Sequence, residues 1–341
     1  MVSIEENKSL KPFNTFGIDV NAAYFTTITT LQELQEVLHS TIYKNEKRLI
    51  LGGGSNMLFT KDFDGLIIKV ALKGIDIVSE NEDTVTIKVA SGEAWHELVL
   101  HCVKNNWGGI ENLSLIPGLT GAAPIQNIGA YGVEIKNVIK EVHGIDLSTG
   151  ESRSFNNEEC CFGYRESVFK HALREKYFIS SVTLTLTQKS HQFNVAYGAI
   201  HDTLKSMHIT TPTVQSISDA VIAIRQSKLP DPRVIGNAGS FFKNPSITQQ
   251  HYQSLQKSFP QIPCYPSVNQ EVKVPAGWLI EQCGWKGKKI NEVGVHVHQA
   301  LVLVNYGNGN GEEIFDLAMK ILASVKEKFS ITLTPEVNII R

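Results

Sequence analysis

The sequence of 341 residues predicts an α+β fold of two domains, and three observations support this. Short apolar or alternating segments outnumber amphipathic helices in the first two thirds of the chain. Strands and helices do not alternate there as regular βαβ units would require. Residues 209–213 (ITTPT) then interrupt the pattern. We therefore expect domains at residues 1–210 and 211–341.

Composition and charge limit the functions that the chain can have. A content of 42% hydrophobic and 19% charged residues is typical of a globular protein, and a net charge of -2 gives nucleic acid no basic surface to bind. No apolar run approaches the roughly 18 residues of a membrane span, and the N-terminal segment is polar. The five cysteines have no metal-ligand spacing. A cytoplasmic protein with reduced thiols is expected.

The elements of the first domain follow from caps and hydrophobic periodicity. Thr30 and Glu33 match a capping box for a helix at 30–39, and Leu31, Leu34, Val37 and Leu38 share one of its faces. A second helix is expected at 94–104; its lone His96 is assigned no catalytic role. Apolar or alternating runs predict strands at 48–51, 66–72, 85–89, 138–147 and 178–186.

The second domain has the more regular helices. A helix at 214–226 ends before two prolines that fix an extended exit. His296 and His298 would point the same way in a strand, but no carboxylate or cysteine supports them, so no metal is expected. Further helices are expected near 246–259, 275–284 and 312–328, and strands in the second half of 294–304 and at 331–340.

Two glycine-rich segments are candidate anion cradles. The strand at 48–51 runs directly into residues 52–58 (GGGSNML), whose successive N–H groups could bind a phosphate. Met57 breaks the dinucleotide fingerprint, and no P-loop motif occurs. Residues 114–135 (SLIPGLTGAAPIQNIGAYGVEI) form a buried loop system whose backbone bonds either to itself or to an acceptor-rich ligand such as a diphosphate. Both interpretations remain open from composition.

Three other motifs have a structural and a functional interpretation. Arg165 in GYRES could present its guanidinium to an anion, although the local pattern favours a surface pair with Glu166. Lys228 at a helix end either complements the helix dipole or reaches a phosphate. Ser240 in GNAGSFFKNP either contacts a ligand or belongs to a turn before a strand; no GxSxG surrounds it, which excludes an acyl-transfer nucleophile.

Eight ordered motifs together resemble the UDP-N-acetylenolpyruvoylglucosamine reductases (UDP-N-acetylmuramate dehydrogenases) of bacterial cell-wall synthesis. They run from NTFG at Asn14 through LGGGSN, IPGLTGAAPIQNIGAYG, GYRES, KLPDP, GNAGSFFKNP and PAGWLIEQCG to PEV at Pro335. The resemblance covers nearly the whole chain. The interval between Arg165 and Ser240, which contains Tyr197, resembles the longer form of the family, which has an extra tyrosine-bearing loop.

The resemblance implies a two-lobed FAD-binding domain of the vanillyl-alcohol-oxidase (PCMH) type, with lobes at about 1–67 and 68–210. A smaller α+β substrate-binding domain, 211–341, would follow, its last strand possibly returning to the first lobe. No RxxGH tether is present, so the FAD is expected to be non-covalent. The implied cofactor-binding residues are Gly52, Gly53, Gly54, Ser55, Asn56, Pro117, Gly118, Gly121, Ala122, Gln126, Asn127, Gly129, Ala130 and Tyr131.

The implied reaction is reduction of the enolpyruvyl ether of a UDP-sugar, with NADPH as the hydride donor to FAD. Ser240 would supply a proton, while Arg165 and Glu336 would flank the substrate carboxylate. The UDP side of the substrate would be held by Tyr197, Lys228, Asn244 and Gln299. A monomer is expected. The alternatives are a carbohydrate or alcohol oxidase on the same flavin fold, and a nucleotide-sugar-binding protein without activity.

Overall fold

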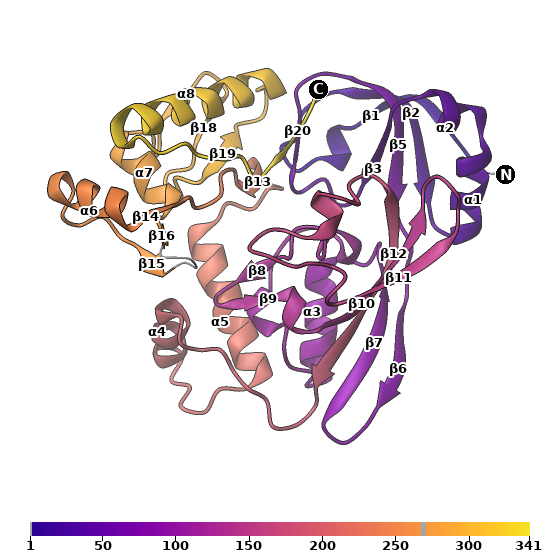
Figure 1. Ribbon diagram of the computed structural model, residues 1–341, viewed down its shortest axis with the longest axis horizontal. Coiled ribbons are helices and arrows are strands. Elements are labelled where there is room, and N and C mark those ends of the chain that lie inside the picture. The colour runs from indigo at the N-terminus through magenta and orange to yellow at the C-terminus, as the bar shows by residue number, and fades with distance from the viewer. Residues whose placement is uncertain (1, 267–270) are drawn as a thin grey trace. The chain divides into compact units, whose positions relative to one another are not determined.

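The computed structural model describes residues 2–266 and 271–341, which form two compact units (Figure 1). The first unit comprises Met1–Lys8, Ala22–Gly53 and Asp64–Ser227, and the second comprises Ser9–Asn21, Gly54–Phe63 and Lys228–Arg341. These limits differ from the expected ranges 1–210 and 211–341. The helix α5 (Val214–Lys228) lies in the first unit because Ile217, Val221 and Ile224 pack with α4 (Gly198–Ser206) in one hydrophobic cluster.

One sheet of the first unit has four strands, with β3 and β5 parallel. In sheet order its strands are β1 (Glu5–Ser9), β2 (Asn21–Ile28), β5 (Phe63–Val70) and β3 (Arg48–Leu51). The helices α1 (Leu31–His39) and α2 (Thr41–Asn45) follow β2. Thr30 and Glu33 form the predicted capping box, and Leu34 and Val37 pack into the cluster of this sheet.

The other large sheet of the first unit is antiparallel and has five strands. In sheet order they are β11 (Ser152–Asn156), β10 (Ile139–Asp146), β12 (Tyr177–Thr187), β7 (Thr84–Ala90) and β6 (Ile75–Glu80). Helix α3 (Trp95–Lys104) packs in the same core through Trp95, Leu98 and Val99. The indole N–H of Trp95 donates to the Leu113 carbonyl at 3.0 Å, which fixes the start of the loop system.

Residues 114–135 form a loop system as the sequence predicted, but only part of it is buried: Pro117, Ala122 and Gly132 are exposed. Its regular pieces are short: η3 (Thr120–Ala122), β8 (Gly129–Ala130) and β9 (Val133–Glu134), with η2 (Glu111–Leu113) before it and η4 (Ile135–Asn137) at its end. The loop is held by backbone bonds such as Thr120 N to Glu93 O at 2.8 Å. A short η5 (Val168–Lys170) precedes β12.

The second unit contains three sheets and three α-helices within its described residues. The four-stranded sheet has the order β13 (Gly236–Ser240), β19 (Val302–Asn305), β18 (Val293–Val295) and β17 (Lys289–Ile290). The three-stranded sheet has the order β14 (Ser246–Thr248), β16 (Glu271–Lys273) and β15 (Tyr265–Pro266). The helices are α6 (Gln249–Ser258), α7 (Ala276–Gln282) and α8 (Gly311–Phe329), and η1 (Lys11–Phe13) lies in the N-terminal segment.

The N-terminal segment joins the second unit through NTFG. The Thr15 carbonyl accepts from Asn237 N at 2.9 Å, and the Phe16 carbonyl accepts from Asn305 Nδ2 at 3.0 Å. A Cβ on Gly236 would collide with the Phe16 carbonyl, so only glycine allows this approach. The first motif of the sequence is therefore a structural part of the second unit.

Three expectations from the sequence need correction. The final strand is only β20 (Asn338–Ile340), because Pro335 interrupts the apolar run 331–340; β20 pairs in parallel with β4 (Met57–Phe59), inside the range 1–67. The helix expected from residue 246 begins at Gln249, since residues 246–248 form β14. Residues 296–298 do not form a strand, so strand geometry does not align His296 with His298. The two rings are nevertheless neighbours and pack edge to face, with 5.6 Å between their centroids.

The described residues contain neither a candidate membrane-spanning helix nor a candidate metal-binding group. No helix formed by residues 2–266 and 271–341 has the length and apolarity that crossing a membrane requires. Within the same ranges, no group of three or more histidine, cysteine or acidic side chains could hold a metal ion.

Candidate active site

The two glycine-rich segments meet in the first unit. A Cβ on Gly53 would lie 3.0 Å from the Gly118 Cα atom, which is tighter than ordinary van der Waals contact. Gly118 itself has φ of 113°, a conformation that residues with a Cβ rarely adopt. The glycines that the sequence singled out therefore allow two backbones to approach each other closely. This contact packs the two candidate anion-binding segments against each other.

A second close approach lies at Gly121. A Cβ there would collide with Ser91, and the Gly121 N–H donates to the Ser91 carbonyl at 2.9 Å. Ser91 is 1% exposed, and among the described residues its hydroxyl has no hydrogen-bond partner. Since buried hydroxyls are normally hydrogen-bonded, an unpaired one beside a glycine cradle fits a site that receives a polar ligand.

Arg165 is held by a tight turn against the same loop system. Gly163 and Glu166 exchange backbone hydrogen bonds of 2.9 and 3.2 Å, which leaves Tyr164 and Arg165 at the tip. Arg165 has φ of 57°, and its guanidinium donates to the carbonyls of Asn127 and Gly129. A strained residue at the tip of a turn is typical of a functional side chain. Glu166 pairs with His171 at 2.7 Å.

The structure adds Arg225 to the first unit's candidates. Its guanidinium lies near the hydroxyl of Tyr131, which belongs to the predicted cofactor loop, and the two groups interact electrostatically. Burial lowers the pKa of Arg225 and raises the pKa of Tyr131, in each case against the effect of the other side chain. Arg225 is not among the residues that the motifs predicted for the site. In the sequence, Arg225 is marked only by its position three residues before Lys228, the first residue of KLPDP.

His96 lies in the same neighbourhood and is neutral near pH 7. Burial lowers its pKa, the nearby Arg225 lowers it further, and Glu97 partly opposes both. The ring Nδ1 accepts a hydrogen bond from Leu115 N at 2.9 Å. His96 therefore holds the start of the glycine-rich loop, which agrees with the structural role expected from the sequence.

The second unit brings Ser240 and Glu336 onto neighbouring segments. Ser240 ends β13, and the next residue, Phe241, accepts a backbone hydrogen bond from Glu336 N at 2.8 Å. The following residues continue this pairing through a bridge between Phe242 and Pro335. Asn56 Nδ2 donates to the Glu336 carbonyl at 3.3 Å, so the glycine-rich turn also reaches this pair. The positions predicted as proton donor and acid are thus close in the fold.

The remaining predicted site residues divide between the two units. In the second unit, Asn244 Oδ1 accepts from Ala276 N at 2.9 Å at the start of α7, and a Cβ on Gly277 would lie 3.4 Å from Gln299 Oε1. Lys228 is exposed at the end of α5. In the first unit, Tyr197 is 46% exposed and packs edge to face on Tyr131, with 5.6 Å between ring centroids.

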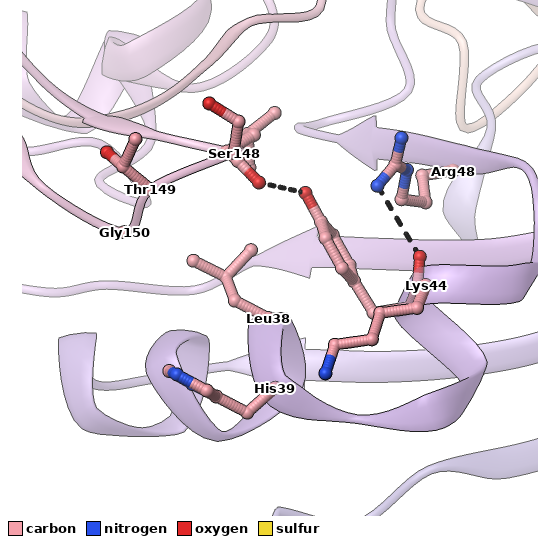
Figure 2. Close-up of a pocket in the computed structure, with 9 residues that line it drawn as sticks. Leu38, His39, Lys44, Arg48, Ser148, Thr149 and Gly150 are labelled. Atoms are coloured by element: carbon pink, nitrogen blue, oxygen red, sulfur yellow. Dashed lines mark hydrogen bonds between the residues drawn. The ribbon is translucent and has the colours of Figure 1, made fainter.

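A cavity of about 330 Å³ in the first unit contains none of these residues (Figure 2). The Tyr43 hydroxyl donates to the Leu147 carbonyl at 2.7 Å on one side of it. Arg48 stacks on the Tyr43 ring at 4.4 Å and donates to the Tyr43 carbonyl at 3.4 Å. These polar groups pair with one another, so we interpret the cavity as a seam between α2 and the turn at residues 147–150.

Comparison with known proteins places this geometry in a family. A relative from Flavobacterium johnsoniae, a UDP-N-acetylenolpyruvoylglucosamine reductase, is 49% identical over 99% of this chain and 100% of its own length. Reductases of the same description from Amoebophilus asiaticus and Chromobacterium violaceum are 48% and 47% identical over 100% and 96% of both chains. This chain belongs to the UDP-N-acetylenolpyruvoylglucosamine reductase family.

Two family models support the membership. The model described as the C-terminal domain of UDP-N-acetylenolpyruvoylglucosamine reductase matches residues 231–340, and the model described as an FAD binding domain matches residues 22–156. The reductase family's fold is also found: the crystal structure of the Thermus caldophilus enzyme superposes with a TM-score of 0.69 over 100% of this chain and 99% of that one, at 20% identity. The predicted α+β class with an FAD-binding domain is confirmed.

Proposed function

We propose that this protein reduces the enolpyruvyl ether of UDP-N-acetylglucosamine to UDP-N-acetylmuramate, with FAD bound non-covalently and NADPH as hydride donor. The observation that carries the proposal is full-length similarity to reductases of that name, combined with Arg165, Ser240 and Glu336 at the motifs that resemble the family's catalytic positions. This reaction belongs to peptidoglycan precursor synthesis, and its substrate is a small-molecule UDP-sugar. A cytoplasmic monomer remains part of the proposal.

The residues of this chain fit FAD. Gly53 and Gly118 bring the two glycine-rich segments into backbone contact, and the buried Ser91 hydroxyl and Arg225 Nε have no partners among the described residues. The loop residues from Pro117 to Tyr131 and the turn from Gly52 to Asn56 would hold the cofactor through backbone N–H groups. Once bound, the flavin supplies a hydride to the methylene carbon of the substrate.

Arg165 and Glu336 would stabilise the charge that hydride addition creates. Addition at the methylene carbon leaves negative charge on the adjacent carbon and its carboxylate. The Arg165 guanidinium is oriented by the carbonyls of Asn127 and Gly129, and a planar guanidinium matches the geometry of a carboxylate. Glu336, in its protonated form, would donate a hydrogen bond to the enol-like intermediate from the segment beside Ser240.

Ser240 would donate the proton that completes the reduction. A serine hydroxyl is a weak acid in water, so it needs a fixed position against the carbanion and a neighbour that balances its oxyanion. The β13–β19 pairing at Ser240 and the backbone bond between Phe241 and Glu336 provide a fixed position. Tyr197, Lys228, Asn244 and Gln299 would hold the UDP portion away from the reacting carbons.

The test is a Ser240→Ala variant followed by stopped-flow flavin absorbance. We expect reduction by NADPH at nearly the wild-type rate, and oxidation by the enolpyruvyl UDP-sugar slowed by about 10²–10⁴-fold, as for loss of a positioned acid. Equal slowing of both half-reactions would contradict the proton-donor role. Oxygen consumption with a sugar alcohol and no NADPH would instead favour an oxidase, and a colourless protein that FAD cannot reconstitute would favour a binding protein.

A further inference from the structure

Arg225 lies on the face of α5 that follows the glycine-rich loop system. Ser218, two helical turns earlier, is on the same face, and its hydroxyl lies 2.8 Å from the Ser114 hydroxyl at the start of the loop. Arg225 then reaches Tyr131 near the other end of the loop. The helix therefore places a cation along the loop that would hold the cofactor.

The guanidinium of Arg225 lacks the partners that a buried cation normally has. Its Nε is inaccessible to solvent and has no hydrogen-bond acceptor in the described part of the chain. The side chain as a whole is half-buried, no carboxylate among those residues forms an ion pair with it, and the neutral Tyr131 hydroxyl lies near the guanidinium. Removing a charge from water without a counter-charge is costly, so such a site is suited to an anion that arrives with a ligand.

We propose that Arg225 is a cofactor-binding residue whose guanidinium pairs with a negatively charged part of bound FAD. This inference rests on the proposed function. FAD carries negative charge on its diphosphate in every redox state, and on the pyrimidine side of its ring when the ring is reduced. Both are acceptors that match the free Nε–H of a guanidinium. Arg225 is thus a counter-charge that the fold supplies before the cofactor binds.

The proposal predicts opposite effects on the apoprotein and on FAD affinity. Arg225→Met removes an unpaired charge while keeping an aliphatic stem, so the apoprotein should unfold at the same or a higher temperature than wild type. The same variant should bind FAD at least tenfold more weakly and lose part of the thermal stabilisation that FAD gives. Arg225→Lys keeps the charge and should recover part of the affinity.

The experiment titrates each apoprotein with FAD by fluorescence and measures the midpoint potential of each holoprotein. Arg48→Met is the matched control, because Arg48 is an exposed arginine of the same unit that stacks on Tyr43. We expect the FAD affinity of the Arg48→Met variant to stay within twofold of wild type. Wild-type protein that takes up no FAD would refute the proposed function and not the role of Arg225.

The two redox states identify which part of FAD is paired. If Arg225→Met weakens the binding of reduced FAD tenfold more than that of oxidised FAD, the potential falls by about 30 mV and the ring is the partner. If both states weaken equally, the potential is unchanged and the diphosphate is the partner. Either result supports the proposal. Unchanged FAD affinity in both states, with a lower apoprotein melting temperature or a loss confined to the UDP-sugar, would overturn it.

Discussion

Gly53→Ala tests whether the contact between the two glycine-rich segments forms the cofactor cradle. The added Cβ would lie 3.0 Å from Gly118 Cα and 3.5 and 3.7 Å from the Gly118 carbonyl carbon and nitrogen. Gly118 cannot easily retreat, because its carbonyl accepts from Trp95 N at 3.0 Å and its φ of 113° is restricted to glycine-like conformations. The two backbones must therefore separate by a few tenths of an ångström.

The expected magnitude follows from the cost of such overpacking. Extra carbon atoms in a packed site typically cost about 1–3 kcal/mol. If the displaced backbone must return to its wild-type position to bind FAD, this cost raises the FAD dissociation constant by about 5- to 150-fold. Fluorescence titration of apoprotein with FAD measures the change directly.

A matched substitution separates this effect from a general effect of alanine. Gly198 is the first residue of α4, has no positive φ, and a Cβ there would meet nothing within 4 Å. Gly198→Ala should bind FAD as tightly as wild type. FAD affinity unchanged in Gly53→Ala would refute the assignment of this contact to the cofactor cradle, and a matching loss in Gly198→Ala would show that the effect is not specific.

Two further predictions concern the helix α8 and the cysteines. Asn310→Ala removes the side-chain cap that accepts from Glu313 N at 2.9 Å, so the free energy of unfolding in urea should fall by about 1 kcal/mol. Asn310→Asp keeps an oxygen at the cap and should retain the wild-type stability. Equal stability of all three proteins would contradict the cap's role. Burial raises the pKa of Cys102 and of Cys160 to about 12, so their thiolates are scarce at pH 8. Iodoacetamide should therefore modify the exposed Cys161 and Cys264 first. Early labelling of Cys102 in mass spectra would contradict this.

Local patterns were sufficient to predict most individual elements. The α1 cap at Thr30, the α3 and α8 helices, and the strands β7, β10 and β12 were all predicted within a few residues, because their caps and hydrophobic periods are written in adjacent residues. The last strand was predicted too long, although Pro335 within the apolar run is a sequence signal that interrupts a strand. Pairing with β4 limits it to Asn338–Ile340.

The division into units depended on contacts that no local pattern contains. The expected boundary at residue 210 followed a change in composition, whereas α5 stays with the first unit because its apolar face packs on α4. Similarly, NTFG gave only a turn signal in the sequence. Its carbonyls bond to Asn237 and Asn305 in the second unit, more than two hundred residues away along the chain.

Short motifs were enough to propose residue types for the site, namely the glycines, Arg165, Ser240 and Glu336. Folding brings Gly53 against Gly118, sets Ser240 and Glu336 on adjacent segments, and leaves the half-buried Arg225 with no carboxylate partner among the described residues. Motifs record what a residue can do chemically. Burial and counter-charges depend on what distant segments bring beside that residue, and this information exists only once the chain has folded.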